Sequence, residues 1–292
     1  MTLILDGRKL RDEGVKRLKE VIAKSAKTPV LAILQVGALA ESGAYISQKK
    51  KFAEQIGAKV LHQTFSETVD DAELVGNIAN LNDDDGVDGI IVQLPLPPRL
   101  DKQKVIDAIA PVKDVDGLTS ANKKIFEAGD RRAVVPATAK GVLSLLRGYG
   151  LSVAGKRVTV IGRSDLVGGP IATLMKREGA QATVCHRGTS DIAGKSRTAD
   201  ILIVAAGRPK LVTRDFVSPG EVVVDVGINS PSTGRPAAKL EEEIPTRRLV
   251  GDVDFEDVAP IVSAISPVPG GVGPMTVLSL FENLCDAAEV SF

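Results

Sequence analysis

From Val158 to Val184 the chain reads VTVIGRSDLVGGPIATLMKREGAQATV. The apolar runs Val158–Ile161 and Ala182–Val184 predict two strands, and the periodic segment that begins near Pro170 predicts a helix between them. The turn after the first strand is rich in small residues, so its backbone can approach a ligand closely. A helix that begins beside such a turn points unpaired N–H groups and its positive dipole end at an anion. The segment therefore predicts a strand–turn–helix–strand unit whose turn can hold a phosphate.

The turn departs from the usual dinucleotide pattern, G-x-G-x-x-G. Ser164 stands where the second glycine is expected, and the last glycine, Gly168, falls one residue late. The match is therefore to the physical mechanism of phosphate binding and not to the motif itself. Taken alone, the segment leaves an ordinary strand-to-helix turn as an open alternative.

The residues after the second strand indicate which dinucleotide would bind. An NAD enzyme needs Asp or Glu about twenty residues beyond the first glycine, to bind the ribose hydroxyls. This chain has no acid there and reads Cys185-His186-Arg187. Arg187, with Arg163 in the turn, would suit the additional phosphate of NADP, because a guanidinium pairs with phosphate in a bidentate way. NADP is the predicted cofactor; the alternative is that both arginines are solvated loop residues.

The composition argues against several other classes of protein. The chain has 292 residues and 43% hydrophobic content, enough for two domains. It carries 37 basic and 37 acidic residues and only 3% aromatic residues without Trp, which argues against a nucleic-acid partner. The two cysteines and two histidines have no metal-binding spacing, so we expect reduced thiols and no metal site. No leader or membrane-spanning run is recognisable, so we expect a cytoplasmic protein without a membrane partner.

Apolar runs and helical patterns alternate along almost the whole chain, which predicts parallel sheets covered by helices. We expect an α/β protein with two α/β domains around a cleft, the second a Rossmann-type doubly wound parallel sheet. The first domain would comprise residues 1–140 plus 270–292, and the second residues 141–269. Residues 230–247 are typical of a surface loop. The predicted strands lie at 30–36, 59–61, 89–93, 158–161, 182–184, 200–204 and 221–226, and the predicted helices at 7–26, 44–56, 71–82, 102–110, 136–147, from about 170, and 275–288.

The first domain contains the candidates for acid–base chemistry. Tyr45 and Lys49 are four residues apart in a predicted helix, so their side chains share one face. Lys50 and Lys51 project about 100 and 200 degrees round the helix from Lys49, so they can be exposed while Lys49 points inward. A desolvated lysine has a lowered pKa and can transfer a proton near neutral pH. The commoner alternative is a solvated charge run on a surface helix.

Two polar residues elsewhere could join this site. Gln93 ends a predicted strand just before the proline-rich segment Leu94–Pro98, and its amide could hydrogen-bond the lysine. Asp114 and Asp116 precede Gly117 and are typical turn residues. An aspartate there could instead bind an amino-substituted heterocycle through charge-assisted hydrogen bonds.

Six segments of the chain form a specific ordered set, although each is weak alone. They are Tyr45-Ile-Ser-Gln-Lys49, Asp88-Gly-Ile-Ile-Val-Gln-Leu-Pro-Leu-Pro97, Lys113-Asp-Val-Asp-Gly117, Gly162-Arg-Ser164 with Val167-Gly168, Asp225-Val-Gly-Ile-Asn229 and Pro267-Val-Pro-Gly-Gly-Val-Gly-Pro-Met-Thr276. In this order they resemble the methylenetetrahydrofolate dehydrogenase/methenyltetrahydrofolate cyclohydrolase family, and the resemblance covers nearly the whole chain.

The resemblance implies a bifunctional folate enzyme of one-carbon metabolism, which supplies purine biosynthesis. Such an enzyme oxidises methylenetetrahydrofolate to methenyltetrahydrofolate with NADP and then hydrolyses the product to formyltetrahydrofolate. The family pattern makes Lys49 the catalytic acid/base, Tyr45 the residue that stacks on the folate, Gln93 the residue that tunes the lysine, and Asp116 the anchor of the pterin. It also implies a homodimer formed through the second domain.

The same resemblance extends to the residues that would bind the ligands. For the folate substrate these are Tyr45, Gln93, Leu94, Pro95, Asp116, Pro269, Gly270 and Gly271. For NADP they are Gly162, Arg163, Ser164, Val167, Gly168, His186, Arg187, Ala206, Gly207, Gly227, Ile228 and Thr276.

Two segments depart from the family pattern. The chain has Leu118-Thr-Ser120 where the family usually has Phe-His-Pro, and Pro136-Ala-Thr-Ala139 where it often has Pro-Cys-Thr-Pro. These changes leave open a dehydrogenase with weak or absent cyclohydrolase activity. A non-catalytic folate- or NADP-binding paralogue is a second alternative. Short-chain dehydrogenases also contain Tyr-x-x-x-Lys, but their cofactor turn comes first, whereas Gly162 follows Lys49 here.

Overall fold

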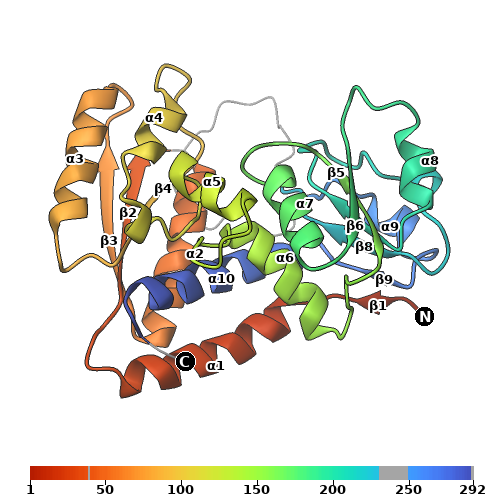
Figure 1. Ribbon diagram of the computed structural model, residues 1–292, viewed down its shortest axis with the longest axis horizontal. Helices are drawn as coiled ribbons and strands as arrows, with labels where there is room; N and C mark the ends of the chain where they lie inside the picture. The colour runs from red at the N-terminus through yellow and green to blue at the C-terminus, as the bar shows by residue number, and fades with distance from the viewer. Residues whose placement is uncertain (39, 230–248, 291–292) are drawn as a thin grey trace. The chain divides into compact units, whose positions relative to one another are not determined.

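The computed structural model describes residues 1–38, 40–229 and 249–290 (Figure 1). The chain divides into two compact units. Unit 1 comprises Met1–Asp12 and Thr138–Thr276, and unit 2 comprises Glu13–Ala137 and Val277–Phe292. Each unit contains a parallel sheet with helices, so the predicted α/β class is confirmed. The loop expected at residues 230–247 lies outside the described residues.

The described residues of unit 1 form a six-stranded parallel sheet in the order β1-β9-β8-β7-β5-β6. Strand β5 lies between β6 and β7, so the chain leaves β5 on one side and later returns on the other. This arrangement makes the carboxyl end of β5 a topological switch point, where open α/β sheets bind ligands. The strands are β1 (Leu3–Ile4), β5 (Arg157–Ile161), β6 (Gln181–Cys185), β7 (Ile201–Val204), β8 (Val222–Asp225) and β9 (Ala264–Ile265).

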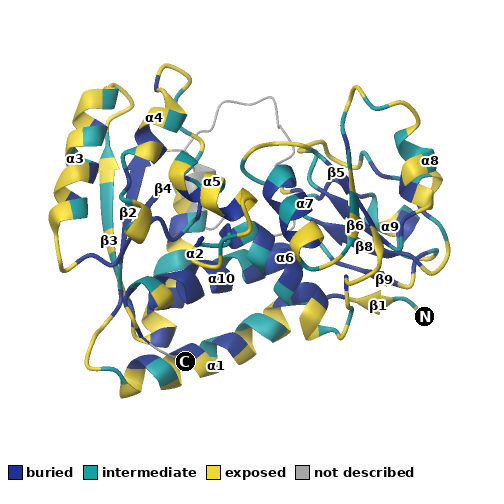
Figure 2. Ribbon diagram, in the orientation of Figure 1, coloured by how far each residue is buried: buried dark blue, intermediate teal, exposed yellow. Residues whose placement is uncertain are grey.

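Helices pack on this sheet, and the residues that they bury colour its ribbon dark blue in Figure 2. A buried cluster joins Ile161, Leu202 and Val223 of the sheet to Val258 of a short helix. Burial of such side chains supplies the main favourable free energy of folding. The helices are α6 (Ala137–Gly148), α7 (Gly168–Arg177), α8 (Ile192–Arg197) and α9 (Phe255–Val258), with the 3-10 turn η2 (Arg214–Phe216).

The first residues of the chain belong to the sheet of unit 1. Strand β1 pairs in parallel with β9, and the backbone N–H of Leu5 donates to the carbonyl oxygen of Ile265 at 2.9 Å. The Tyr149 hydroxyl accepts the N–H of Asp6 at 2.9 Å. Strand β1 was not expected from the sequence, because two residues carry no visible alternation.

Unit 2 is built on a three-stranded parallel sheet in the order β3-β2-β4 among its described residues. Alternate residues of the central strand, such as Leu34, join Leu74 and Ile78 of one covering helix in a buried cluster. An isolated bridge between Ile90 and Asp114 extends the sheet beyond β4. The elements are β2 (Val30–Val36), α2 (Ala40–Ile56), β3 (Lys59–Phe65), α3 (Asp71–Asp83), β4 (Gly89–Val92), α4 (Lys102–Asp107), η1 (Pro111–Lys113) and α5 (Ser120–Glu127).

Two long helices run from one unit into the other: α1 (Gly7–Lys24) and α10 (Val272–Ala287). In unit 2 the Phe281 ring of α10 stacks on Phe52 of α2, with ring centroids 4.9 Å apart. Leu284 packs so closely that a Cβ added at Gly89 would lie 2.8 Å from its side chain. The expectation that the last helix packs back on the first domain therefore holds for its carboxyl-terminal half.

Several boundaries differ from the sequence interpretation. Helix α2 begins at Ala40 and α10 at Val272, each earlier than expected, while β3 continues to Phe65. Helix α5 was not expected, because it has only 8 residues and its sequence is mostly polar. Its start is fixed by Thr119, whose hydroxyl accepts the N–H of Asn122 at 3.1 Å as an N-cap.

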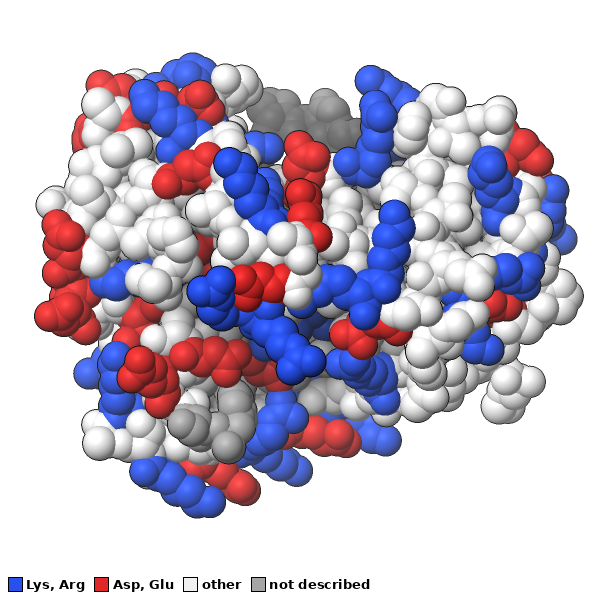
Figure 3. Space-filling model, in the orientation of Figure 1, with Lys and Arg blue, Asp and Glu red and all other residues white. Residues whose placement is uncertain are grey.

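The surface carries both signs of charge. Figure 3 shows acidic and basic side chains interspersed over the visible face. No helix among the described residues has the length and apolar character needed to cross a membrane. Within those same residues, no group of three or more His, Cys, Asp or Glu side chains is placed to hold a metal ion.

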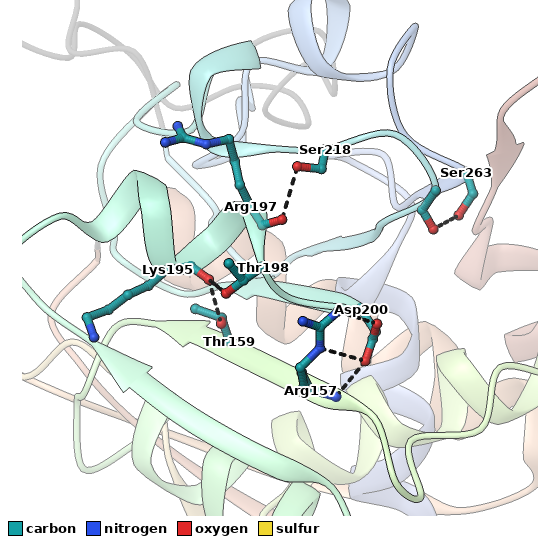
Figure 4. A network of polar contacts seen from close by, with 9 residues as sticks. Arg157, Thr159, Lys195, Arg197, Thr198, Asp200, Ser218 and Ser263 are labelled. Carbon is teal, nitrogen blue, oxygen red and sulfur yellow. Dashed lines mark hydrogen bonds and ion pairs between the residues drawn. The ribbon is translucent and has the colours of Figure 1, made fainter.

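A cavity of about 630 Å³ lies at the amino ends of β5, β7 and β8, opposite the switch point. Figure 4 shows the polar contacts around it: the Arg157 guanidinium pairs with Asp200 at 3.1 Å, and the Ser218 hydroxyl donates to the carbonyl oxygen of Arg197 at 3.0 Å. Glu221 lines the cavity and is buried; its Oε2 accepts the N–H of Ser218 at 3.0 Å. Its Oε1 has no hydrogen-bond partner among the described residues. Burial raises the pKa of Glu221 to about 8.

This carboxyl group should make stability fall with rising pH. In the unfolded chain Glu221 ionises near its ordinary pKa, whereas the folded protein keeps the proton until about pH 8. Stability from this group is therefore present at low pH and is lost between about pH 4.5 and 8, with a slope of at most about 1.4 kcal/mol per pH unit. We predict that Glu221→Gln, which keeps an acceptor for Ser218, raises the melting temperature relative to the wild type increasingly from pH 5 to 9. Each kcal/mol corresponds to roughly 2–4 °C in a chain of this size. Parallel melting curves across this range would contradict the prediction.

Candidate active site and cofactor site

A lysine amine and a glutamine amide meet in unit 2. Lys49, in helix α2, donates from Nζ to Oε1 of Gln93 at 2.9 Å. The Gln93 amide is oriented by its other atom, because Nε2 donates to the carbonyl oxygen of Leu94 at 2.8 Å. Gln93 therefore presents an acceptor to the lysine. Tyr45, one helical turn before Lys49, is half-buried like the lysine.

The parallel sheet brings the polar residues together. Gln93 directly follows β4, and its backbone N–H donates to the carbonyl oxygen of Leu34 at 2.8 Å, which extends the pairing with β2. The bridge between Ile90 and Asp114 aligns the next segment beside β4. Asp116, two residues beyond that bridge, thus lies at the same edge of the sheet as Gln93. The peptide bond between Leu94 and Pro95, which directly follow Gln93, is cis.

The two aspartates of the Asp-Val-Asp-Gly turn have different roles. The carboxylate of Asp114 is buried and accepts the N–H groups of Gly117 at 2.9 Å and Thr119 at 2.9 Å, together with the Thr119 hydroxyl at 2.7 Å. Asp114 is therefore the turn residue. Asp116 interacts electrostatically with Lys49 instead.

Burial perturbs both charged groups of this pair. Desolvation lowers the pKa of Lys49, and the nearby Asp116 carboxylate opposes this shift by favouring the charged amine. Desolvation raises the pKa of Asp116 to about 6, opposed by Lys49 and reinforced by Asp114. An amine whose pKa is lowered and a carboxyl group whose pKa is raised are both better suited to exchange protons with a ligand than their solvated forms.

We expected the side chains of Lys50 and Lys51 to be exposed, and the structure shows this for one of the two. Lys51 is exposed, whereas Lys50 is half-buried. The Lys50 amine lies 2.9 Å from Nδ1 of His62, whose Nε2 lies 2.9 Å from Oε1 of the buried Gln35. Lys50 therefore ties helix α2 to strands β2 and β3, which helps to fix the rotation of the helix that carries Lys49.

The glycines of the phosphate turn in unit 1 are required by the backbone of the protein itself. Gly162 has φ +124°, and a Cβ there would lie 2.1 Å from the carbonyl oxygen of Ala205. A Cβ at Gly168 would lie 2.2 Å from the carbonyl oxygen of Gly162. Between them, the Ser164 hydroxyl accepts the N–H of Val167 at 3.2 Å at the start of α7. From the sequence we expected these small residues to allow a ligand to approach; in the structure, the close packing of the turn itself requires them.

Both predicted phosphate-binding arginines are exposed at adjacent strand ends. Arg163 follows β5 and Arg187 follows β6, and the N–H of Gly162 donates to the carbonyl oxygen of Cys185 at 2.9 Å between them. His186 begins a turn, and its Nδ1 accepts the N–H of Gly188 at 3.1 Å. A guanidinium on each of two neighbouring strand ends fits the phosphate of an NADP ribose.

The remaining predicted ligand residues also lie in unit 1. Ala206 and Gly207 follow β7, and Gly227 and Ile228 follow β8, with Ile228 exposed. The segment Pro269–Gly271 follows β9 and begins with a cis peptide bond between Val268 and Pro269. Gly270 has φ +120°, a conformation that favours glycine. The Thr276 hydroxyl, in α10, donates to the carbonyl oxygen of Val272 at 3.3 Å.

Two buried asparagines support the site and were missed by the sequence interpretation. Asn283 of α10 donates from Nδ2 to the carbonyl oxygens of Val115 at 2.9 Å and Val135 at 3.0 Å. Asn122 of α5 bonds both the carbonyl oxygen and the N–H of Val134, at 2.7 and 2.8 Å. These amides hold the turn that carries Asp116. The sequence did offer one signal for Asn283: it is a polar residue between the apolar Phe281 and Leu284 of the last helix.

Similarity to known proteins extends over nearly the whole chain. Residues 136–292 match the model "Tetrahydrofolate dehydrogenase/cyclohydrolase, NAD(P)-binding domain", and residues 5–116 match "Tetrahydrofolate dehydrogenase/cyclohydrolase, catalytic domain". The chain is 44% identical over 292 residues to the "Bifunctional protein FolD" of Lacticaseibacillus casei, which covers 99% of this chain and 98% of the relative.

Solved structures give the same result. The bifunctional FolD methylenetetrahydrofolate dehydrogenase/cyclohydrolase of Campylobacter jejuni matches with a TM-score of 0.91 and 39% identity over 99% of both chains. A Trypanosoma brucei methylenetetrahydrofolate dehydrogenase-cyclohydrolase, solved with NADP and an inhibitor, matches with a TM-score of 0.90 and 35% identity over 99% of this chain and 97% of the other. With the fold, the ordered motifs and this similarity in agreement, the chain belongs to the tetrahydrofolate dehydrogenase/cyclohydrolase family.

Proposed function

We propose that the protein oxidises methylenetetrahydrofolate to methenyltetrahydrofolate with NADP and then hydrolyses this product to formyltetrahydrofolate. The observation that carries the proposal is the contact of the Lys49 amine with Gln93 in the electrostatic field of Asp116. The names of the relatives support both activities, and the Trypanosoma brucei title names NADP. NADP, when bound, supplies the hydride acceptor.

The residues of unit 1 suit this cofactor. The turn from Gly162 to Gly168 at the switch point would hold the pyrophosphate at the start of α7. Arg163 and Arg187 would bind the 2′-phosphate, and β6 is followed by Cys185–Arg187 without the acid that an NAD ribose needs. The other predicted cofactor residues follow β7 and β8, or lie in α10, in the same unit.

Lys49 has the properties required for the hydrolysis. Water adds to the cationic methenyl carbon and loses a proton, and the five-membered ring then opens by cleavage of a carbon–nitrogen bond. A neutral Lys49 amine can accept the proton without repelling the cation and can return it to the leaving nitrogen. Gln93 holds the amine in place through its Oε1. Asp116 would anchor the pterin by accepting from its amino-substituted ring, and Tyr45 would stack on the folate.

The substrate, the partners and the location complete the proposal. The folate would contact Leu94, Pro95 and the segment Pro269–Gly271 besides the residues above. We propose a homodimer in the cytoplasm, formed through the domain that binds NADP, with no nucleic acid or membrane partner. We also propose the functional domain boundaries that the sequence predicts. Residues 1–140 plus 270–292 would bind folate, and residues 141–269 would bind NADP.

The direct test is a spectrophotometric assay. Mixing the protein with methylenetetrahydrofolate and NADP should give NADPH absorbance, followed by decay of the methenyl product as it is hydrolysed. Oxidation without enhanced hydrolysis would favour the alternative of a dehydrogenase with weak cyclohydrolase activity. That alternative was left open by the departures from the family pattern at Leu118–Ser120, Ala137 and Ala139. No oxidation at all, with ligands still bound, would identify a non-catalytic paralogue.

We predict that Lys49→Met lowers the hydrolysis rate by about 10²-fold or more, because general acid–base catalysis contributes roughly that much. NADP affinity should stay within twofold, since the cofactor residues lie in unit 1. Lys51→Met is the matched control, because Lys51 is exposed on the same helix. Hydrolysis of added methenyltetrahydrofolate at the wild-type rate by the Lys49 variant would refute the role of the lysine.

We predict that Arg187→Ser raises the KM for NADP by roughly tenfold or more, because it removes a charge-assisted contact to the 2′-phosphate. Turnover with NAD, which lacks this phosphate, is the internal control and should not fall. Steady-state kinetics with both cofactors measure the effect. An equal loss of activity with NADP and with NAD would show that Arg187 does not bind the 2′-phosphate.

A further inference from the structure

A buried aspartate accepts hydrogen bonds from successive backbone N–H groups of the loop that follows β7. Asp252 is fully buried, and its Oδ2 accepts the N–H groups of Ala206 at 2.6 Å and Gly207 at 2.8 Å. Its Oδ1 accepts the N–H of Arg208 at 2.8 Å. Successive N–H groups that converge in this way form a concave anion site. Here the anion is a side chain of the protein, so these N–H groups are already engaged.

The same carboxylate also holds the segment that follows β8. Asn229 donates from Nδ2 to Oδ1 of Asp252 at 2.8 Å. Gly227 lies so close that a Cβ there would be 2.2 Å from Cγ of Asp252. One side chain therefore connects the loops at the carboxyl ends of β7 and β8, which carry Ala206, Gly207, Gly227 and Ile228.

A second buried carboxyl group supports the first. Asp225, at the end of β8, accepts the N–H groups of Asp252 at 3.0 Å and Val253 at 2.9 Å. It also accepts the N–H of Gly227 at 2.9 Å. Burial raises the pKa of Asp225 to about 7, opposed by these hydrogen bonds and reinforced by the charge of Asp252. The backbone that carries Asp252 is thus fixed from the strand end.

The loop held by Asp252 continues to the phosphate turn. The carbonyl oxygen of Ala205 packs against Gly162, where a Cβ would lie 2.1 Å away. The N–H of Ala205 donates to the carbonyl oxygen of Ile161 at 2.7 Å. A shift of the 206–208 loop would therefore also displace the turn that follows β5.

We propose that Asp252 is a positioning residue for cofactor binding, which sets the loops after β7 and β8 against the phosphate turn without touching the cofactor itself. This inference rests on the proposed function, because it takes these loops as the NADP site. It also predicts that Ala206 and Gly207 contact the cofactor through atoms other than their N–H groups. Support of a binding surface by a buried, fully bonded second layer is the general way in which such sites keep their geometry.

An amide cannot replace the carboxylate at this position. Each carboxylate oxygen accepts two donors, Ala206 and Gly207 on one side and Arg208 and Asn229 on the other. In Asp252→Asn, whichever oxygen becomes an NH₂ group leaves two part-buried donors facing a donor. Two donors that face an NH₂ group beside the buried residue 252 lose their hydrogen bonds, which is costly, so the loop should move.

The experiment compares Asp252→Asn with Asp254→Asn, a control two residues away whose exposed partner is Lys210. We expect Asp252→Asn to raise the KM and Kd for NADP by roughly tenfold or more. Hydrolysis of added methenyltetrahydrofolate, which needs no NADP, should stay within twofold of the wild type in both variants. Amide hydrogen exchange across residues 205–208 should become faster in Asp252→Asn only.

Each other outcome has a defined meaning. NADP affinity within twofold of the wild type in Asp252→Asn overturns the proposal, and so does an equal loss of oxidation and hydrolysis, which would indicate general destabilisation. If that variant does not fold, Asn229→Ala removes a single donor and must weaken NADP binding while hydrolysis is retained; unchanged binding again overturns the proposal. A wild-type protein that does not oxidise methylenetetrahydrofolate with NADP would refute the proposed function instead.

Discussion

Parallel strand pairing is the constraint on which both sites depend. Parallel strands end at the same edge of a sheet, so residues far apart in the chain meet wherever they directly follow a strand. In unit 2 this places Gln93, after β4, beside the segment of Asp116, which is aligned by the bridge between Ile90 and Asp114. In unit 1 it places the phosphate turn after β5 between the ends of β6 and β7.

Among the described residues, several acidic side chains organise backbone, whereas Asp116 interacts electrostatically with Lys49. Asp114 and Asp252 each accept several backbone N–H groups, so their charge is compensated by loops that they hold. Asp116 has its pKa raised to about 6 and faces Lys49. Desolvation also raises the pKa of Asp225 to about 7, although this carboxyl group accepts three backbone N–H groups, so backbone donors by themselves do not set the pKa of a buried acid.

The tertiary structure also changes the explanation of the glycine-rich segments. Gly162 and Gly168 are needed because neighbouring backbone leaves no room for a Cβ, and Gly227 is needed because Asp252 lies against it. A sequence pattern shows that small residues occur, but the atom that excludes the side chain is known only when the fold is known. In this protein those atoms belong to Ala205, Gly162 and Asp252.

The sequence by itself determined the α/β class, the strand–turn–helix unit at 158–184 and the motifs that place the chain in its family, because local periodicity and fixed spacings are written along the chain. It also indicated that Tyr45 and Lys49 share a helix face. Only the tertiary structure decided that β1 joins the sheet of unit 1, that Lys50 binds His62, and that Asn283 and Asp252 hold functional loops. These contacts join residues that are distant in sequence and leave no local periodicity, so they arise only when the chain is packed.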